Sequence, residues 1–543
     1  MIINISKFIL SFGFSKETLI KLKNFLDKYG VWIVTFALSA VSILSFIFYY
    51  QNGLGLAYND ARSHLDIGRR VVEGLKPGIA QLGSVWLPLT HILMVPTVWN
   101  DFMWHSGLSG AIQSMIGFVA TGALIYLFLK ELGVGIIGRF FGVAVFAANI
   151  NVLYLQSTAM TELLLLATMT AGAYQLLLWH KNENILHLIK SAFWIMLSTL
   201  VRYDGWFLFF FAAMMVLGYV WKRKGYKAAE GNFVLFCTLG GFGIFLWFLW
   251  NQLIFGDALY FAFGPYSARA QQKQLETAGV LATKGDWFFS LKVYFYALAY
   301  NTGAFTLFLG VVGSVALWFS KNISPRIRIA TIALIAPFLF NVLALYLGHS
   351  VLFIQGLSGE SWFNARYGIM LMPSIAIFVG FLVHRAKPLR FVIIGLFIFV
   401  TFFQFTNGDA VTIDDATVGS SQKNVSEVSG WLGENAKDRA GLILISAASH
   451  DAIIFSSGLP MKKFIHEGTG AYWTAATEIP DHYARWIVMR SYSDDDQTWR
   501  LINETVGFER YERVRQYPFA DIYQLKEEYL KDLELNPSFG AQK

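Results

Sequence analysis

The sequence has few charged residues and almost no cysteine. Only 15% of its 543 residues are Asp, Glu, Lys or Arg, whereas 55% are hydrophobic. Soluble domains carry roughly 25% charged residues, so this composition excludes a large soluble protein and indicates a polytopic membrane protein. The single cysteine, Cys237, lies in the apolar run FVLFCTLGGFGIFLWFLW, where we expect a small lipid-buried side chain. One cysteine also excludes an internal disulfide and a cysteine-based zinc site.

Several sequence patterns are missing as well. We find no internal repeat and no low-complexity tract. The segment after residue 406 contains no G-x-G-x-x-G pattern, so the sequence does not support nucleotide binding there. The N-terminal stretch MIINISKFILSFGF has no A-x-A-like cleavage site after its short apolar core, so we expect no cleaved signal peptide.

Apolar runs predict the membrane spans, because a spanning helix needs about 20 apolar residues. We predict about eleven transmembrane helices. They lie near 31–50, 107–129, 134–153, 161–179, 188–201, 205–221, 232–254, 299–319, 329–347, 367–384 and 390–406. The region 188–221 also fits one long span, but basic residues at both of its ends favour a hairpin that turns at 202–204.

The basic residues predict the orientation of these spans. The net charge is +7, but acidic residues outnumber basic ones after residue 406, so the basic excess belongs to the membrane part. With a cytoplasmic N-terminus, all five inner loops carry Lys or Arg, as the positive-inside rule requires. We therefore expect a multi-pass protein of the cell (plasma) membrane, with an extracytoplasmic C-terminal part and no nucleic-acid partner. Residues 15–30 predict either a helix on the cytoplasmic surface or an extension of the first span.

The segment 407–543 differs in character from the rest. Buried-strand patterns such as GLILIS and ARWIVM alternate with helical ones, which is typical of a small α/β domain. The predicted organisation is therefore a membrane domain at 1–406 and an extracytoplasmic α/β domain at 407–543. The predicted fold class is mainly α, with interfacial helices in the first outer loop.

The first outer loop holds a dense polar cluster, YNDARSHLDIGRRVVEG. Its apolar spacing predicts a helix along the membrane interface, with the charged side chains facing away from the lipid. Asp60 either caps this helix or acts as a general base. His64, one turn later, either orients Asp60, binds a divalent metal with it, or is a hydrogen-bonded structural histidine. No cofactor is required by these residues, and a metal stays an open alternative.

Three further groups lie at predicted outer ends of spans. Glu162 starts the fourth span, either as a second acid in the site or as a charge that stabilises the helix N-terminus. Arg202 and Arg366 are each followed by Tyr, and Arg62 belongs to the first-loop cluster. Guanidinium groups suit phosphate oxygens, although snorkelling to the interface explains many such arginines.

The order of these motifs resembles that of the GT-C membrane glycosyltransferases, in the branch of the protein O-mannosyltransferases and lipid A aminoarabinose transferases (family 39 and relatives). The segments that carry the resemblance are YNDARSHLDIGRRVVEG, LGSVWLPLTHILMVP, STAMTELLLL, LSTLVRYDGWFL and NARYGIMLMPSIAIFVG. They span most of residues 31–405. The family's paired Asp-Glu is Asp60-Ala61 here, so the second carboxylate is missing. The W-W-D-Y-G motif of oligosaccharyltransferases is also absent, which argues against transfer of a preassembled oligosaccharide.

The resemblance implies a GT-C fold and an enzyme of the EC 2.4 type. Such an enzyme moves a sugar, for which mannose is one candidate, from a polyprenyl-phosphate donor to a hydroxyl of a protein, lipid or glycan acceptor. The catalytic acid of the family maps onto Asp60, and Glu162 occupies a position where relatives carry further acids. Attack opposite the leaving phosphate would invert the anomeric carbon. The alternative is a transporter or flippase for a lipid-linked glycan, although we find no repeat of the kind common in transporters.

Overall fold

The computed structural model describes residues 16–264, 267–277, 279–419 and 422–539. The expectation about a signal peptide concerns residues that lie outside these ranges. The chain forms two compact units, one of residues 1–54 with 111–415 and one of residues 55–110 with 416–543. The second unit therefore contains the first outer loop, which we had grouped with the membrane part, in addition to most of the C-terminal segment.

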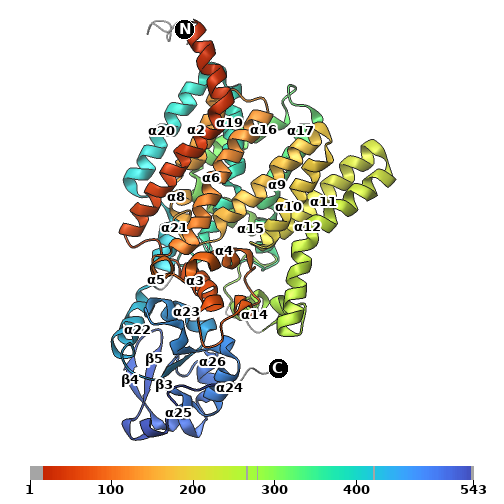
Figure 1. The fold of residues 1–543 in the computed structure, drawn as a ribbon. Coiled ribbons are helices and arrows are strands. Elements are labelled where there is room, and N and C mark those ends of the chain that lie inside the picture. Colours follow the sequence, from red (N-terminus) through yellow and green to blue (C-terminus); the bar gives the residue numbers. More distant parts are fainter. Residues whose placement is uncertain (1–15, 265–266, 278, 420–421, 540–543) are drawn as a thin grey trace. The chain divides into compact units, whose positions relative to one another are not determined.

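The first unit is built from helices (Figure 1). The longer ones are α2 (Lys16–Gln51), α6 (Leu108–Glu131), α7 (Ile136–Ala147), α9 (Glu162–Asn182), α10 (Ile185–Thr199), α11 (Tyr203–Lys224), α12 (Tyr226–Phe255), α15 (Trp287–Thr302), α16 (Ala304–Trp318), α18 (Ala336–Tyr346), α19 (Met372–Arg385) and α20 (Arg390–Asn407). The shorter ones are α8 (Ile150–Leu155), α13 (Tyr260–Phe263), α14 (Ala268–Thr277), α17 (Pro325–Thr331), η2 (Ile332–Ile335), η3 (Ala365–Leu371), η4 (Lys387–Leu389) and α21 (Val411–Asp414).

Every predicted span overlaps at least one helix of this unit, and some cover more than one. Among the described residues, eight helices are long and apolar enough to cross a membrane, and a ninth span arises if α15 and α16 are counted together. This pair is bent by 109° at Gly303, whose φ of +81° lies in the region that favours glycine. The predicted spans at 134–153 and 188–201 fall on α7 and α10, which are shorter than an upright crossing requires.

The structure decides two alternatives that the sequence left open. Helix α2 continues without a break from Lys16 to Gln51, so the basic segment before the first span extends that span. The region 188–221 is broken between Thr199 and Tyr203 into α10 and α11, which pack against each other, so the hairpin prediction is confirmed.

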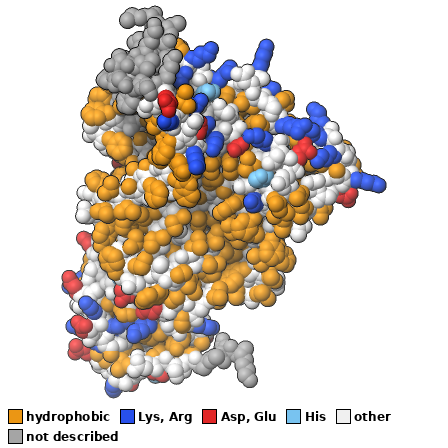
Figure 2. Space-filling model, turned by 45° about the horizontal axis from the view of Figure 1, so that its top comes forward, with side chains coloured by type: hydrophobic (Ala, Val, Ile, Leu, Met, Phe, Trp, Pro, Cys, Tyr) orange, Lys and Arg blue, Asp and Glu red, His pale blue; other side chains and the backbone are white. Residues whose placement is uncertain are grey.

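Exposed apolar side chains and close helix contacts are both typical of a membrane protein. Hydrophobic side chains cover a broad part of the surface in Figure 2. Phe36, Phe210 and Phe308 are among the strongly exposed apolar residues. Inside the unit, glycines let helices approach closely: a Cβ at Gly313 of α16 would lie 2.2 Å from the carbonyl oxygen of Phe378 in α19. Small residues at helix crossings are typical of packing in lipid, where backbone approach replaces hydrophobic burial.

The second unit contains a five-stranded sheet with the order β2-β1-β3-β5-β4. The strands are β1 (Leu442–Ile445), β2 (Phe464–Ile465), β3 (Ala484–Met489), β4 (Tyr511–Gln516) and β5 (Asp521–Leu525). Strand β1 runs parallel to β2 and β3, whereas β5 pairs antiparallel with β3 and β4. The helices of this unit are α3 (Asn59–Val72), η1 (Ile79–Leu82), α4 (Leu89–Val98), α5 (Asp101–His105), α22 (Gln422–Asn435), α23 (Ala447–Ser456), η6 (Met461–Lys463), η7 (Glu467–Thr469), α24 (Ala471–Glu478), α25 (Pro480–Tyr483), α26 (Gln497–Ile502), η8 (Val506–Arg510) and η9 (Glu527–Asp532).

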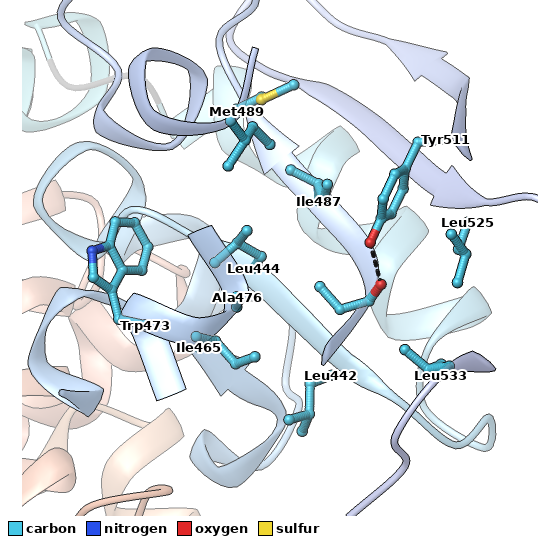
Figure 3. Packing of buried hydrophobic residues seen from close by; sticks show 12 residues of the cluster. Leu442, Leu444, Ile465, Trp473, Ala476, Ile487, Met489, Tyr511, Leu525 and Leu533 are labelled. Carbon is cyan, nitrogen blue, oxygen red and sulfur yellow. Dashed lines mark hydrogen bonds between the residues drawn. The ribbon is translucent and has the colours of Figure 1, made fainter. Parts of the chain in front are cut away.

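Alternation of strands and helices predicted this α/β arrangement, except for β2, which is too short for a pattern to show. An apolar cluster on one face of the sheet packs β1 and β3 against α24, with Leu444, Ile487 and Trp473 among its members (Figure 3). The buried hydroxyl of Tyr511 donates to the carbonyl oxygen of Ala484, so the polar tip of this ring is satisfied within the core.

The polar face of helix α3 is covered by protein. We expected its charged side chains to face away from the lipid, and Arg62, Asp66 and Arg69 are all at least 93% buried. The reason is that α3 packs on α4 on one side and on α23 of the C-terminal segment on another. An amphipathic pattern shows that a helix has a polar face, but not whether water or protein covers it.

Candidate active site

In the first unit, one buried carboxylate joins two of the predicted arginines. Glu162 is the first residue of α9 and is completely buried. Its Oε1 accepts hydrogen bonds from Nη1 of Arg202 at 3.2 Å and from Nε of Arg366 at 3.1 Å. Its Oε2 is buried without a hydrogen-bond partner among the described residues. The carboxylate thus lies at the N-terminus of α9 and is shared by two guanidinium groups.

Arg202 lies in extended backbone at the break between α10 and α11. Besides Glu162, it contacts Oδ2 of Asp204 through Nε at 3.3 Å and donates to Oγ1 of Thr161 at 3.3 Å. Its guanidinium carbon lies 4.8 Å from the centre of the Tyr367 ring. The side chain is 20% exposed, more than those of Glu162, Asp204, Arg366 and Asp415.

Arg366 belongs to η3, directly before α19. Its Nη1 lies 3.8 Å from Oδ2 of Asp415, and its guanidinium carbon lies 5.4 Å from the centre of the Tyr367 ring. Tyr367 thus lies beside both guanidinium groups, and the cluster combines two cations with three carboxylates. We call Glu162, Arg202, Arg366, Asp204, Asp415 and Tyr367 the arginine cluster. Snorkelling does not describe these arginines, because both are tied to buried carboxylates.

In the second unit, Asp60 lies in the first turn of α3 and is half-buried. The N-cap position of α3 is held by Tyr58, whose side chain makes no capping hydrogen bond. Asp60 is therefore a first-turn residue and not the N-cap. A carboxylate in the first turn interacts favourably with the positive end of the helix dipole.

His64, one turn along α3, forms a pair with a histidine that sequence reasoning missed. Its Nδ1 lies 2.8 Å from Nε2 of His91 on α4, and its ring centre lies 4.3 Å from that of Trp86. His91 is fully buried. Burial lowers the pKa of His91 well below its ordinary value, and the nearby charges of His64 and Arg70 act in the same direction. His91 is thus held neutral and fixes the His64 ring.

No metal site is complete around these residues. Among the described residues, no group of three or more His, Cys, Asp or Glu side chains is arranged to hold a metal ion. The alternative in which His64 and Asp60 bind a divalent metal therefore lacks a third protein ligand of these types.

Arg62 is the third predicted phosphate ligand. Its Nε donates to the carbonyl oxygen of Leu56 at 3.0 Å, whereas its Nη1 is buried without a hydrogen-bond partner among the described residues. Burial lowers the pKa of Arg62 to about 10, and the charge of Asp66 opposes this effect. A buried N–H group without a partner is costly, so this atom is a candidate donor to a ligand oxygen.

The six predicted residues therefore form two groups, with Glu162, Arg202 and Arg366 joined in the first unit and Asp60, Arg62 and His64 on α3. Sequence reasoning missed Asp415, Tyr367 and His91. Tyr367 and His91 lie inside the motifs NARYGIM and LPLTHILM that carried the family resemblance, which was the available signal.

Solved structures resemble this chain, whereas protein-family models and curated sequences do not. No protein-family model and no curated protein sequence matches the chain. ArnT from Cupriavidus metallidurans, solved with bound undecaprenyl phosphate, superposes with a TM-score of 0.55 at 10% identity, covering 92% of this chain and 99% of ArnT. The apo structure of the same ArnT gives a TM-score of 0.52 at 11% identity, covering 92% and 98%. The coverage is nearly complete in both directions, and the fold of this membrane protein is the GT-C fold.

Proposed function

We propose that the protein transfers a sugar from a polyprenyl-phosphate donor to a hydroxyl group of an extracytoplasmic acceptor, with inversion at the anomeric carbon. The observation that carries this proposal is the common fold with a protein whose structure contains undecaprenyl phosphate. In this proposal the N-terminus is cytoplasmic and the C-terminal α/β part is outside, as the basic inner loops favour.

Asp60 is the proposed general base. Its carboxylate takes the proton of the acceptor hydroxyl while the acceptor oxygen forms a bond to the anomeric carbon. The bond between that carbon and the phosphate oxygen breaks on the opposite side, and its electron pair leaves with the polyprenyl phosphate. His64, held by His91, orients the groups around the first turns of α3.

Arginines stabilise the phosphate charge that develops as the sugar leaves. Arg202 is supported as a phosphate ligand by its remaining exposure, and Arg62 by its buried Nη1 without a protein partner. Glu162 holds the guanidinium groups of Arg202 and Arg366 in one orientation. We therefore assign Glu162 a positioning role and not proton transfer, because its Oε1 already accepts hydrogen bonds from both guanidinium groups.

The direct test uses the purified protein in liposomes with a panel of polyprenyl-phosphate sugars carrying a radiolabel, mannose among them, and with protein, lipid and glycan acceptors. Covalent transfer of label, with release of the polyprenyl phosphate and inverted stereochemistry, is the expected result. Movement of label across the bilayer without a covalent product would overturn the proposal in favour of a transporter or flippase.

A further inference from the structure

Two carboxyl groups from distant parts of the sequence meet inside the second unit. Asp66 on α3 is completely buried, and the side chain of Asp451 on α23 is 12% exposed. Helices α3 and α23 pack on each other, and the two carboxyl groups interact directly. Two ionised carboxylates have no hydrogen to donate, so a hydrogen bond between them requires one of the two to be protonated.

The surroundings indicate which group holds the proton. Oδ2 of Asp451 lies 3.6 Å from Nη2 of Arg70, so the guanidinium group favours the charge on Asp451. Asp66 instead accepts at Oδ1 from Nε1 of Trp104, a neutral donor, at 3.2 Å. The remaining oxygens, Oδ2 of Asp66 and Oδ1 of Asp451, receive no N–H or O–H donor from the described residues, as expected for two oxygens joined by a proton.

We propose that Asp66 and Asp451 share a single proton at neutral pH and that this carboxyl pair is a pH-sensitive joint holding α3 against the C-terminal α/β segment. Burial raises the pKa of Asp66 well above its ordinary value, and the charge of Asp451 raises it further, while Arg70 opposes the shift. Burial also raises the pKa of Asp451, although Arg70 and the hydrogen bonds from Asp66 and Ser63 act in the other direction.

Helix α23, which is kinked at His450, is held by side chains from two other segments of the unit. At its N-terminus, the Glu467 carboxylate accepts from the backbone N–H groups of Ala447 at 2.9 Å and Ala448 at 3.4 Å. One turn later, Nε2 of His450 lies 2.6 Å from Oδ2 of Asp496, the N-cap of α26. Helix α23 is therefore tied to η7 and to the start of α26, which lie in the same unit.

Trp104 of α5 completes the joint with an apolar contact. Besides donating to Asp66, its ring meets that of Phe455 on α23 edge to face, with ring centres 5.8 Å apart. The guanidinium carbon of Arg69 lies 4.6 Å from the centre of the same ring. A movement of α3 away from α23 would therefore break the carboxyl pair and this packing together.

The other charged and titratable groups around the pair come from α3, from α4 and from the residue after β2. Arg62 and Arg70 come from α3 itself, and His91 of α4 and His466 after β2 interact with Arg70. Burial lowers the pKa of both histidines well below the ordinary value, so neither adds positive charge. One shared proton leaves one negative charge opposite Arg70, whereas losing it leaves two carboxylates in contact.

The sign of the pH effect follows from these directions. A carboxyl group whose pKa is raised on folding contributes stability that is fully present below its unfolded pKa and is lost as the pH rises through its folded pKa. The joint is therefore expected to weaken as the pH rises from about 4 upward through the raised pKa of the pair. If the folded and unfolded pKa values of the pair differ by one, the Tm of this part of the chain is expected to change by about 3–5 °C.

The first experiment follows thermal unfolding of the full-length protein against pH for the wild type, Asp66→Asn and Asp451→Asn. An asparagine amide at position 66 donates the same hydrogen bond at every pH, so the Tm of Asp66→Asn is expected to gain on that of the wild type by several degrees as the pH rises. Asp438→Asn, at an exposed position of the same segment, is the matched control and should follow the wild type. A constant difference in Tm at every pH would overturn the proposal.

The second experiment detects the proton directly and does not depend on the stability of one variant. Infrared difference spectra between neutral and alkaline pH should contain a protonated-carboxyl C=O band in the wild type that is absent in Asp66→Asn. If Asp66→Asn does not fold, Asp451→Asn serves instead, since it removes the charge that raises the pKa of Asp66 and should shift the titration of the same band. A wild type without a protonated carboxyl at neutral pH would overturn the proposal.

A consequence for activity rests on the proposed function, because α3 carries Asp60. The alkaline limb of kcat/KM should be flatter in Asp66→Asn than in the wild type, while Asp438→Asn keeps the wild-type profile. The spectroscopic and unfolding tests need no substrate. Absence of sugar transfer would therefore not contradict the shared proton, and absence of a protonated carboxyl would not contradict the proposed transferase activity.

Discussion

Glu162 and Arg366 are separated by 204 positions in the sequence, yet Nε of Arg366 donates to Oε1 of Glu162 at 3.1 Å. Glu162 opens α9 and Arg366 lies in η3 just before α19. The same oxygen accepts from Arg202, so one carboxylate connects three segments of the helical unit. This connection gives the predicted phosphate ligands a common support.

Replacing Glu162 by Gln should destabilise the helical unit strongly. The amide removes the carboxylate charge that Arg202 and Arg366 share, and leaves them only Asp204 and Asp415. Breaking a buried ion pair from one side typically costs about 3–5 kcal/mol. Thermal unfolding in detergent measures the loss. Glu230→Gln is the control, since Glu230 is exposed on α12. Equal Tm values for the two variants would contradict a central role for Glu162.

Replacing Arg202 by Lys should reduce kcat/KM for the polyprenyl-phosphate donor by about 10- to 100-fold, the loss expected for one or two charge-assisted hydrogen bonds. A lysine keeps the charge but cannot contact Glu162 and Asp204 as a planar guanidinium group does. Steady-state kinetics with varied donor give the answer. Arg385→Lys, at an exposed position at the end of α19, is the matched control. A wild-type KM and kcat in Arg202→Lys would remove Arg202 from the phosphate site.

Replacing Asp60 by Asn should lower kcat by about 10²- to 10⁴-fold, the usual contribution of a general base. The binding of donor should change little, because the amide has nearly the same shape as the carboxylate. Single-turnover transfer and a separate donor-binding assay distinguish the two effects. Transfer at the wild-type rate with an active donor would show that another group accepts the proton.

Replacing His91 by Phe should make the second unit less sensitive to acid. The pKa of His91 is lowered on folding, so the histidine costs stability as the pH falls through its ordinary value of 6.5 toward its folded pKa. Phenylalanine removes this dependence, although it leaves His64 without its ring partner and lowers Tm at neutral pH. The measurement is Tm between pH 5 and 8. His482→Phe, at an exposed position, should keep the wild-type pH dependence.

Replacing Gly313 by Ala should destabilise the contact between α16 and α19 by about 1–3 kcal/mol, the usual cost of overpacking. The added methyl group would lie 2.2 Å from the carbonyl oxygen of Phe378, so the helices must move apart. Gly395→Ala in α20 is the control, because a Cβ there meets nothing within 4 Å. Thermal unfolding of both variants checks the difference, and a Tm for Gly313→Ala as high as that of the control would contradict the packing described.

Much of the secondary structure could be predicted, because its signals are local. Apolar runs located a helix for each of the eleven predicted spans, and basic residues at both ends of 188–221 identified the break before Tyr203. Strand β2 was missed because two residues carry no periodicity. The bend at Gly303 was missed because a single glycine in an apolar run does not distinguish a kinked helix from a broken one.

The sequence by itself determined which side chains were candidates for the site and which end of each predicted span they occupy, since hydrophobicity and charge act over one or two helical turns. The tertiary structure alone decided which of them meet. Glu162 accepts hydrogen bonds from Arg202 and Arg366. His64 contacts His91, and Asp66 interacts with Asp451. The physical reason is that a buried charge must find a counter-charge or a proton, and the partner that satisfies it can come from any part of the chain that the fold brings near.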